Sequence, residues 1–266
     1  MPELLFLKLG GSLITDKSRP YTPRLEILAD LCAQIASVLN SAGGGLQLLL
    51  GHGSGSFGHT AADQHGTRRG VQGAEGWRGF AEVHHQAAAL NMIVMEKLHG
   101  VGVPALSFPP SASVIAREGK AARWDIGPLE RALANGLVPV VYGDTVFDET
   151  IGGTILSTEE LFQHLAPRLQ PSRLLLAGLE PGVWEDFPTR TRLIPQITPD
   201  SYTKMRGGIL GAASVDVTGG MEAKVREMLE LVAAVPGLSV QIFSAEAPGN
   251  LRRALLGDSL GTVILL

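Results

Sequence analysis

Three of the six lysines in the chain stand in or beside glycine turns, a combination that is typical of phosphate binding. Lys8 and Lys17 flank the turn at Gly10-Gly11, and Lys224 follows a later glycine pair. Backbone N–H groups at glycine turns bind phosphate oxygens, and lysine ammonium groups balance their charge. Because a phosphoryl group in transfer needs mainly positioning and cations, the pattern predicts phosphoryl transfer. Glycines that only make tight turns would also explain each loop taken alone.

A second glycine loop, residues 51–59, reads Gly-His-Gly-Ser-Gly-Ser-Phe-Gly-His directly after an apolar run. Part of it matches the dinucleotide pattern G-x-G-x-x-G. A Rossmann fold carries that pattern after its first strand, whereas here it follows the second, so a nicotinamide enzyme is not favoured. The P-loop and the G-x-S-x-G elbow are absent from the sequence. Two glycine loops side by side would instead hold a donor phosphate and an acceptor phosphate.

No set of residues is spaced for binding a metal. The H-E-x-x-H motif is absent, and a single cysteine, Cys32, excludes a cysteine-based zinc finger. His65, His84 and His85 have no partners at ligand spacing, and we interpret them as surface or capping residues. The sequence therefore predicts no protein-held metal site.

The elements that must position these residues alternate along the chain. Apolar runs predict buried strands near residues 4–9, 46–50, 103–107, 137–142, 174–177, 239–243 and 262–266. Helical spacing predicts helices near 23–40, 77–98, 158–166 and 221–233, and Gly152-Gly153 predicts a hairpin. Such repeated strand–glycine–helix units predict an α/β fold, a three-layer αβα sandwich around a mostly parallel sheet. Pro167–Pro171 is the expected boundary between two lobes of one domain.

Composition narrows the class of protein further. The 266 residues carry a formal net charge of −4 and a pI of about 6.0, which argues against nucleic-acid binding. The first apolar run is broken at Lys8, and no stretch approaches eighteen uninterrupted apolar residues. We therefore expect neither a signal peptide nor a membrane span, and the single cysteine fits a reducing, cytoplasmic setting.

Two motifs together resemble a known family. Lys8-Leu-Gly-Gly-Ser12, with Ile14-Thr-Asp-Lys17, is similar to the amino acid kinase superfamily. The loop Gly55-Ser-Phe-Gly-His59 narrows the resemblance to the isopentenyl phosphate kinases. Pro139-Val-Val-Tyr-Gly-Asp144 and Asp216-Val-Thr-Gly-Gly-Met-Glu-Ala-Lys224 extend it in the right order along the chain.

The resemblance implies an amino acid kinase-like fold, ATP, Mg²⁺ and a homodimer. It implies transfer of the γ-phosphoryl group of ATP to isopentenyl monophosphate, which gives isopentenyl diphosphate. Within one domain, residues 1–266, the lobe of about 1–170 would bind the acceptor and the lobe of about 171–266 the nucleotide.

The resemblance also implies site residues, position by position. The implied catalytic residues are Lys17, His59 and Lys8. The implied ATP contacts are Lys8, Leu9, Gly10, Gly11, Ser12, Gly55, Glu180, Gly220 and Lys224. The implied acceptor contacts are Ser54, His59, Ser157 and Thr158. A capping or packing histidine at 59 and a plain surface lysine at 17 remain the alternatives.

The apolar tail of such an acceptor requires a closed apolar pocket. The helix expected at 77–98 is the first predicted after the 51–59 loop, so its start should lie near the acceptor phosphate. Phe80 and Val83 are the candidates for the pocket wall, whereas Ala87 and Leu90 on the same face are more typical of core residues.

Two departures from the family pattern leave other functions open. Thr158-Glu159-Glu160 replaces the usual Gly-Asp-Asp, and Pro181 after Glu180 replaces an acidic residue, which puts nucleotide and magnesium contacts in doubt. The alternatives are a fosfomycin-type phosphonate kinase of the same fold and a non-catalytic, nucleotide-binding regulatory protein.

Overall fold

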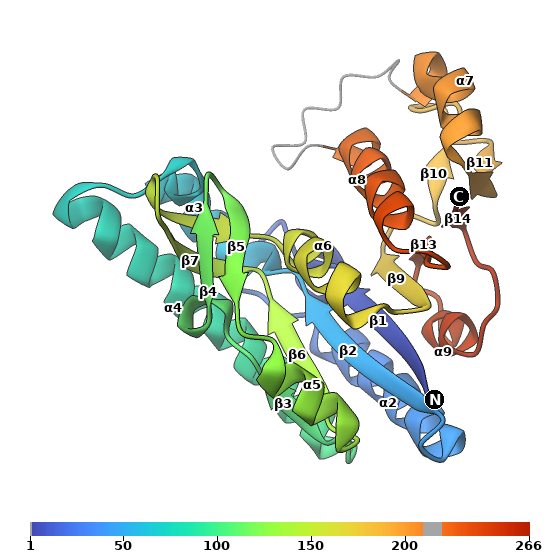
Figure 1. Ribbon diagram of the computed structural model, residues 1–266, viewed down its shortest axis with the longest axis horizontal. Coiled ribbons are helices and arrows are strands. Elements are labelled where there is room, and N and C mark those ends of the chain that lie inside the picture. Colours follow the sequence, from blue (N-terminus) through green and yellow to red (C-terminus); the bar gives the residue numbers. More distant parts are fainter. Residues whose placement is uncertain (1, 210–219) are drawn as a thin grey trace.

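An eight-stranded sheet runs through the middle of the molecule, with helices on both faces (Figure 1). The computed structural model describes residues 2–209 and 220–266, except for the side chains of His59 and residues 205–209. The strand order is β12-β14-β13-β9-β1-β2-β6-β3. From β13 to β3 neighbouring strands are parallel, and only the β13–β14 pair is antiparallel. The predicted mostly parallel sheet is confirmed.

The elements have the following bounds. The strands of the large sheet are β1 (Glu3–Leu9), β2 (Leu46–His52), β3 (Ala105–Ser107), β6 (Val138–Tyr142), β9 (Arg173–Gly178), β12 (Gln196–Ile197), β13 (Ser239–Ser244) and β14 (Thr262–Ile264). A small sheet, of order β5-β4-β7-β8, contains β4 (Val114–Arg117), β5 (Lys120–Trp124), β7 (Asp144–Asp148) and β8 (Gly152–Leu156), while β10 (Val183–Trp184) pairs with β11 (Leu193–Ile194). The helices are α1 (Gly11–Ile14), α2 (Leu25–Ala42), α3 (Gly55–His65), α4 (Gly73–Gly100), α5 (Gly127–Ala134), α6 (Thr158–Leu169), α7 (Pro199–Ile209), α8 (Gly220–Ala234) and α9 (Asn250–Leu255), with short 3₁₀ turns η1 (Thr67–Arg69) and η2 (Pro110–Ala112).

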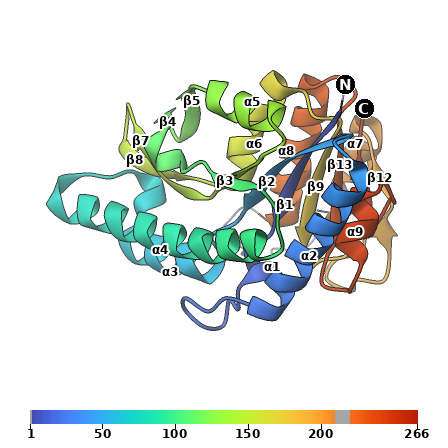
Figure 2. The ribbon, with the colours of Figure 1, turned by 90° about the horizontal axis from the view of Figure 1, so that it is seen from below.

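The large sheet separates two apolar cores (Figure 2). Helices α2, α4 and α9 cover one face, and α5, α6 and α8 cover the other. Alternate side chains of a strand point to opposite faces. Leu7 and Leu9 of β1 therefore enter the first core, whereas Phe6 enters the second and packs against Phe162 of α6, with tilted rings whose centroids lie 5.0 Å apart. The same alternation turns Lys8 toward α6.

Helix α2 is long and apolar enough, by length and composition alone, to cross a membrane. In the structure its Leu28, Leu31 and Ile35 are fully buried in the first core, where α2 packs against α4 and α9. A core helix passes the same test, and burial of these side chains accounts for the apolar stripe of α2.

The predicted helices and the hairpin exist, but the segment between the second strand and α4 is different from the prediction. Residues 51–59 were expected to be loop throughout, whereas α3 already begins at Gly55. The expectation that α4 is the first helix after this loop is therefore wrong, although α4 does pack against α3. Helix α6 also continues past Pro167 to Leu169, beyond the predicted end at 166.

Candidate active site

The two glycine loops meet at the carboxyl edge of the sheet, where β1 and β2 end. Their backbones touch: a Cβ on Gly11 would lie 2.5 Å from the nitrogen of Gly55. Gly53 is equally confined, because its Cβ would lie 2.8 Å from the nitrogen of Gly11. Only glycine permits this approach at these positions. The predicted juxtaposition of the loops is thus present, and a donor and an acceptor phosphate bound to them would be neighbours.

A hydroxyl group that the sequence analysis did not single out joins the loops. Thr15 Oγ1 donates to the carbonyl of Gly11 at 2.7 Å and accepts the N–H of Ser56 at 2.9 Å. Thr15 is buried, so water does not compete for these bonds. Among the described residues, no protein acceptor takes the N–H groups of Gly11, Ser12 or Gly55. These N–H groups therefore remain available to phosphate oxygens.

Two lysines flank one carboxylate on the α6 side of the loops. Lys8 Nζ forms an ion pair with Oε1 of Glu159, in the first turn of α6. Lys224 Nζ, on α8, lies 3.9 Å from the same oxygen. The side chains of Lys8 and Glu159 are 14% and 11% exposed, whereas that of Lys224 is 36% exposed. The cluster therefore has one positive charge in excess, partly shielded from water.

The pKa values of this cluster reflect its burial and its charges. Burial opposes ionisation of Glu159, yet the ammonium groups of Lys8 and Lys224 hold the pKa of its carboxyl at about 2. Burial lowers the pKa of Lys8, and the charge of Glu159 opposes that change. The ionised carboxylate therefore holds the two ammonium groups close together beside the first glycine loop.

Lys17 lies on the other side of the first glycine loop. Its side chain is exposed, and the described residues offer it neither an ion pair nor a hydrogen bond. A hollow of about 600 Å³ opens beside it, and Ser12, Arg24 and Glu246 are among the residues that line the hollow. Lys17 is thus free to reach a phosphate held by the loops.

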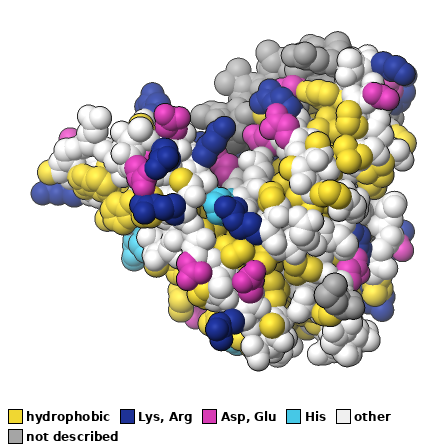
Figure 3. All heavy atoms as spheres, viewed as in Figure 1, with side chains coloured by type: hydrophobic (Ala, Val, Ile, Leu, Met, Phe, Trp, Pro, Cys, Tyr) yellow, Lys and Arg dark blue, Asp and Glu magenta, His cyan; other side chains and the backbone are white. Residues whose placement is uncertain are grey.

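On the face drawn in Figure 3, basic and acidic side chains gather between the small sheet and α8.

The predicted acceptor residues begin at the start of α3. Ser54 is the N-cap residue of α3 and is half-buried, and its Oγ lies over Gly58. His59 belongs to the first turns of α3, but its side chain lies outside the described residues. The position of the helix start beside Gly11 agrees with an anion site there, because helix N-termini favour negative charge.

Ser157 and Thr158 have structural bonds of their own. Ser157 and Glu160 form a capping box that begins α6. The Thr158 hydroxyl donates to the carbonyl of His52 at 2.6 Å and is almost fully buried. Side-chain contacts from these residues to an acceptor, as the sequence suggested, would require breaking those bonds. The N–H of Ser157 already donates to Oε2 of Glu160 at 2.6 Å, so the backbone N–H of Thr158 is the better candidate.

Glu180 is also engaged within the protein. It accepts the indole N–H of Trp184 at 3.0 Å and pairs with Arg190 at 3.3 Å. The carboxylate expected to contact ATP is therefore directed to neighbouring residues of its own loop. Gly220 begins α8 with a φ of +65°, and the glycine before it lies outside the described residues.

An aromatic cluster lies where α4 packs against the small sheet. Phe80 and Val83 of α4 are buried, at 8% and 2% exposure. The Phe80 ring packs on Gly153 of β8 and lies 5.3 Å from Trp77 and 5.1 Å from Phe147, centroid to centroid. Trp77 and Phe147 are partly exposed, so the cluster leads from the interior to the surface.

His84 does more than the predicted surface or capping role. Its Nδ1 lies 3.1 Å from Oδ1 of Asp144, a carboxylate with no exposed surface. The partner lies 60 positions away in the sequence, which is why spacing alone did not reveal it.

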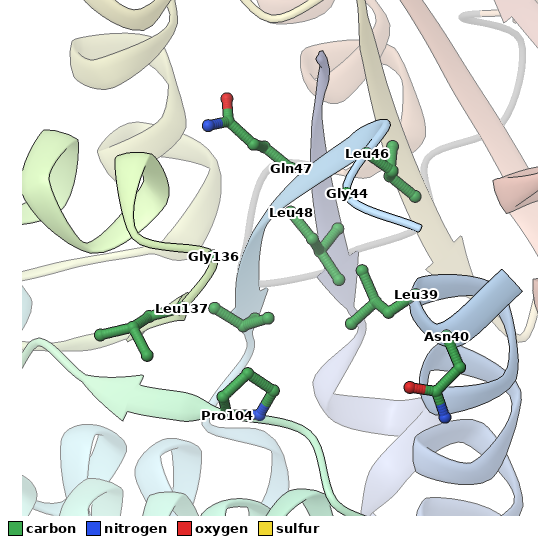
Figure 4. A pocket seen from close by; sticks show the side chains of 10 residues that line it. Leu39, Asn40, Gly44, Leu46, Gln47, Leu48, Pro104, Gly136 and Leu137 are labelled. Atoms are coloured by element: carbon green, nitrogen blue, oxygen red, sulfur yellow. The ribbon is translucent and has the colours of Figure 1, made fainter. Parts of the chain in front are cut away.

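A second hollow lies at the opposite edge of the sheet (Figure 4). Its volume is about 190 Å³, and Leu46, Pro104 and Leu137 line it where β2, β3 and β6 begin. Since both glycine loops lie where strands end, this hollow takes no part in the site.

Comparison with known proteins agrees with this geometry. The model of the amino acid kinase family matches residues 3–244. The chain belongs to the amino acid kinase family. A family member from Methanothermobacter thermautotrophicus, named isopentenyl phosphate kinase, is 35% identical over 97% of this chain and 97% of its own length. One of the same name from Methanocaldococcus jannaschii is 30% identical over 98% of both chains.

Solved structures of the family agree as well. The set titled "X-ray structures of isopentenyl phosphate kinase" matches with a TM-score of 0.81 and 32% identity, over 98% of this chain and 100% of that chain. The family resemblance inferred from the motifs is thereby confirmed, as is the fold class. At the carboxyl edge of its own sheet, this chain places Glu159 between two lysines, although residues 158–160 depart from Gly-Asp-Asp.

Proposed function

We propose that the protein is a kinase that transfers the γ-phosphoryl group of ATP to isopentenyl phosphate and releases isopentenyl diphosphate. One observation carries the proposal: the Lys8–Glu159–Lys224 cluster lies beside the touching glycine loops, and α4, which packs against the helix that begins in the second loop, carries an apolar aromatic cluster. The names of the two relatives and of the solved structures support the same acceptor.

The donor phosphates bind on the lysine side. Lys8 and Lys224 supply positive charge to the β- and γ-phosphates, and Glu159 holds the two ammonium groups in place before ATP arrives. Backbone N–H groups at Gly11 and Ser12 complete the cradle. Such preorganised charge stabilises the transition state without reorganisation at the moment of transfer.

The acceptor needs no general base, because its phosphate is already an anionic nucleophile. Ser54 and Gly55 orient this phosphate at the start of α3, and His59 donates a hydrogen bond to it. Lys17 swings in from the first loop to meet the charge that spreads over the oxygens of the transferring group. The tail lies along Phe80 and Val83, where an alkenyl group finds apolar contacts.

Mg²⁺ enters this scheme as part of the MgATP substrate. Among the described residues, no group of three or more His, Cys, Asp or Glu side chains is arranged to hold a metal ion. Mg²⁺ in kinase sites keeps several waters and binds substrate phosphates, so few protein ligands suffice. When bound, the ion neutralises charge on the β- and γ-phosphates.

The remaining features of the proposal follow the family. The protein acts in the cytoplasm as a homodimer, without nucleic acid or membrane partners, and the lobe of about 1–170 binds the acceptor. Light scattering coupled to size-exclusion chromatography measures the oligomeric state directly.

A coupled ADP-release assay tests the proposed reaction against its alternatives. Purified protein is given MgATP with isopentenyl phosphate or with fosfomycin, at equal concentrations. We expect clear preference for isopentenyl phosphate. Faster turnover of fosfomycin would indicate a phosphonate kinase, and nucleotide binding without turnover of either acceptor would indicate a regulatory protein.

A further inference from the structure

The structure contains a buried carboxylate outside the transfer site. Asp144, the first residue of β7, has no exposed surface. Its Oδ1 accepts the N–H of Thr145 at 2.8 Å, and its Oδ2 accepts the N–H of Ser111 from η2 at 3.3 Å. His84 of α4 supplies the third donor, with Nδ1 at 3.1 Å and 3.3 Å from the two oxygens. A buried carboxylate is costly unless it is paired, so His84 is the partner that makes this burial tolerable.

The residue before Asp144 touches the phosphate end of the acceptor site. A Cβ on Gly143 would lie 3.8 Å from the nitrogen of Ser54 and 3.9 Å from Cα of Ser157. The N–H of Gly143 donates to the carbonyl of His52 at 3.2 Å. Asp144 also pairs with Leu156 in the β7–β8 register, directly before Ser157. A displacement of Asp144 would therefore move the backbone around Ser54 and Ser157.

The residue beside His84 belongs to the wall of the tail pocket. Val83 precedes it, and Phe80 lies one turn earlier on the same helix, which passes along β7 (Figure 1). The hydrogen bonds of the His84 side chain connect α4 to β7. The hydrogen bond to Asp144 raises the pKa of His84, and burial opposes this change. Protonation of the imidazole therefore strengthens its hydrogen bond to the carboxylate.

We propose that His84 and Asp144 are a positioning pair that sets the spacing between the apolar wall of α4 and the phosphate-binding backbone at Ser54. The inference rests on the proposed function, because it assigns the pair to the acceptor and not to ATP. Neither residue touches the reacting atoms. The pair acts through Gly143 on one side and through Val83 on the other.

Michaelis constants for both substrates test the pair in the full-length protein. We expect His84→Ala to raise the KM for isopentenyl phosphate about 10-fold or more, because small misplacements of a binding group cost at least that much. The KM for ATP should change less than about twofold, since Lys8, Glu159 and Lys224 are untouched. His84→Gln should recover most of the loss, because its amide N–H can still donate to Asp144.

The neighbouring residue provides a matched control. His85 lies on the same helix but is exposed, and His85→Ala should leave both KM values unchanged. If His84→Ala fails to fold, Asp144→Asn takes its place, since it keeps the shape and removes the charge. An acceptor KM within twofold of the wild type in the folded variant, or an equal rise of both KM values, overturns the positioning role. Wild-type protein that does not turn over isopentenyl phosphate would overturn the proposed function itself, and the pair's role with it.

Discussion

Beside the touching glycine loops, two lysines share a single buried carboxylate, whereas between α4 and the small sheet aromatic rings pack against each other. The charged side takes Lys8, Glu159 and Lys224 from three distant parts of the chain. The aromatic side is more local, because Trp77 and Phe80 come from one helix and meet Phe147 of the small sheet. Removal of one charge from the first side leaves its partner charge buried and uncompensated. Removal of a ring from the second side leaves a cavity. The first side should therefore govern rate, and the second side should govern which tail is accepted.

Replacement of Lys17, across the first glycine loop from the charged side, should have the largest effect on rate. Lys17→Ala should lower kcat on the order of 10²-fold or more, about 3 kcal/mol, because Lys17 meets charge that develops only during transfer. The KM for ATP should change little. Steady-state kinetics with both substrates measure the split. Near-normal kcat with only a raised KM would mean that Lys17 binds substrate and does not assist transfer.

Replacement of Glu159 tests whether the carboxylate holds the two lysines. Glu159→Gln should lower the free energy of unfolding at pH 7 by about 3 kcal/mol, since the ammonium groups then lack their counter-charge. The pKa of Glu159 is lowered from 4.5 to about 2, so the difference is fully present above pH 4.5. It should shrink as pH falls from 4.5 through 2. Urea unfolding of both proteins across this range, followed by circular dichroism, supplies the comparison, and a pH-independent difference would exclude the charge as the cause.

His59 lies in α3, the helix that begins at the second glycine loop. His59→Ala should raise the KM for isopentenyl phosphate about 10-fold, as expected for one lost hydrogen bond to an anion. His59→Gln should keep part of the activity, because an amide N–H still donates. Equal collapse of both variants in folded protein would point to proton transfer or to charge.

Replacement of Phe80 probes the aromatic side and should have the smallest effect on rate. Phe80→Ala and Val83→Ala should favour geranyl over isopentenyl phosphate relative to the wild type, by about fourfold for each methylene that the new space buries. Leu90→Ala, buried on the same helix, is the control that loses packing without enlarging the pocket. Competition assays with mixed prenyl phosphates give the ranking. An unchanged ranking in both folded variants would show that α4 does not limit the length of the tail.

Sequence reasoning reached the parts of this site that are local in the chain. The strand at 4–9, the glycine turns and the apolar stripe of α4 all follow from neighbouring residues. The partnership of Glu159 with two lysines does not, because it forms only when β1, α6 and α8 come together. Helix α3 was missed because Gly55-Ser-Phe-Gly-His59 has weak helix propensity, and contact with the first glycine loop, through Thr15, offsets it. The His84–Asp144 pair was missed for the same reason as Glu159: both partners look ordinary until the fold joins them.

The central position of β1 has a consequence for how the chain assembles during synthesis. Residues 3–9 pair with β2 early, but their other neighbour, β9, begins only at Arg173. During synthesis, the backbone groups on the β9 side of β1 therefore stay without a strand partner until much of the chain has left the ribosome. An apolar strand with an open edge is a template for pairing with other chains. Nascent chains of this protein should thus be most prone to association, and most dependent on chaperones, in the interval before residues 173–178 leave the exit tunnel.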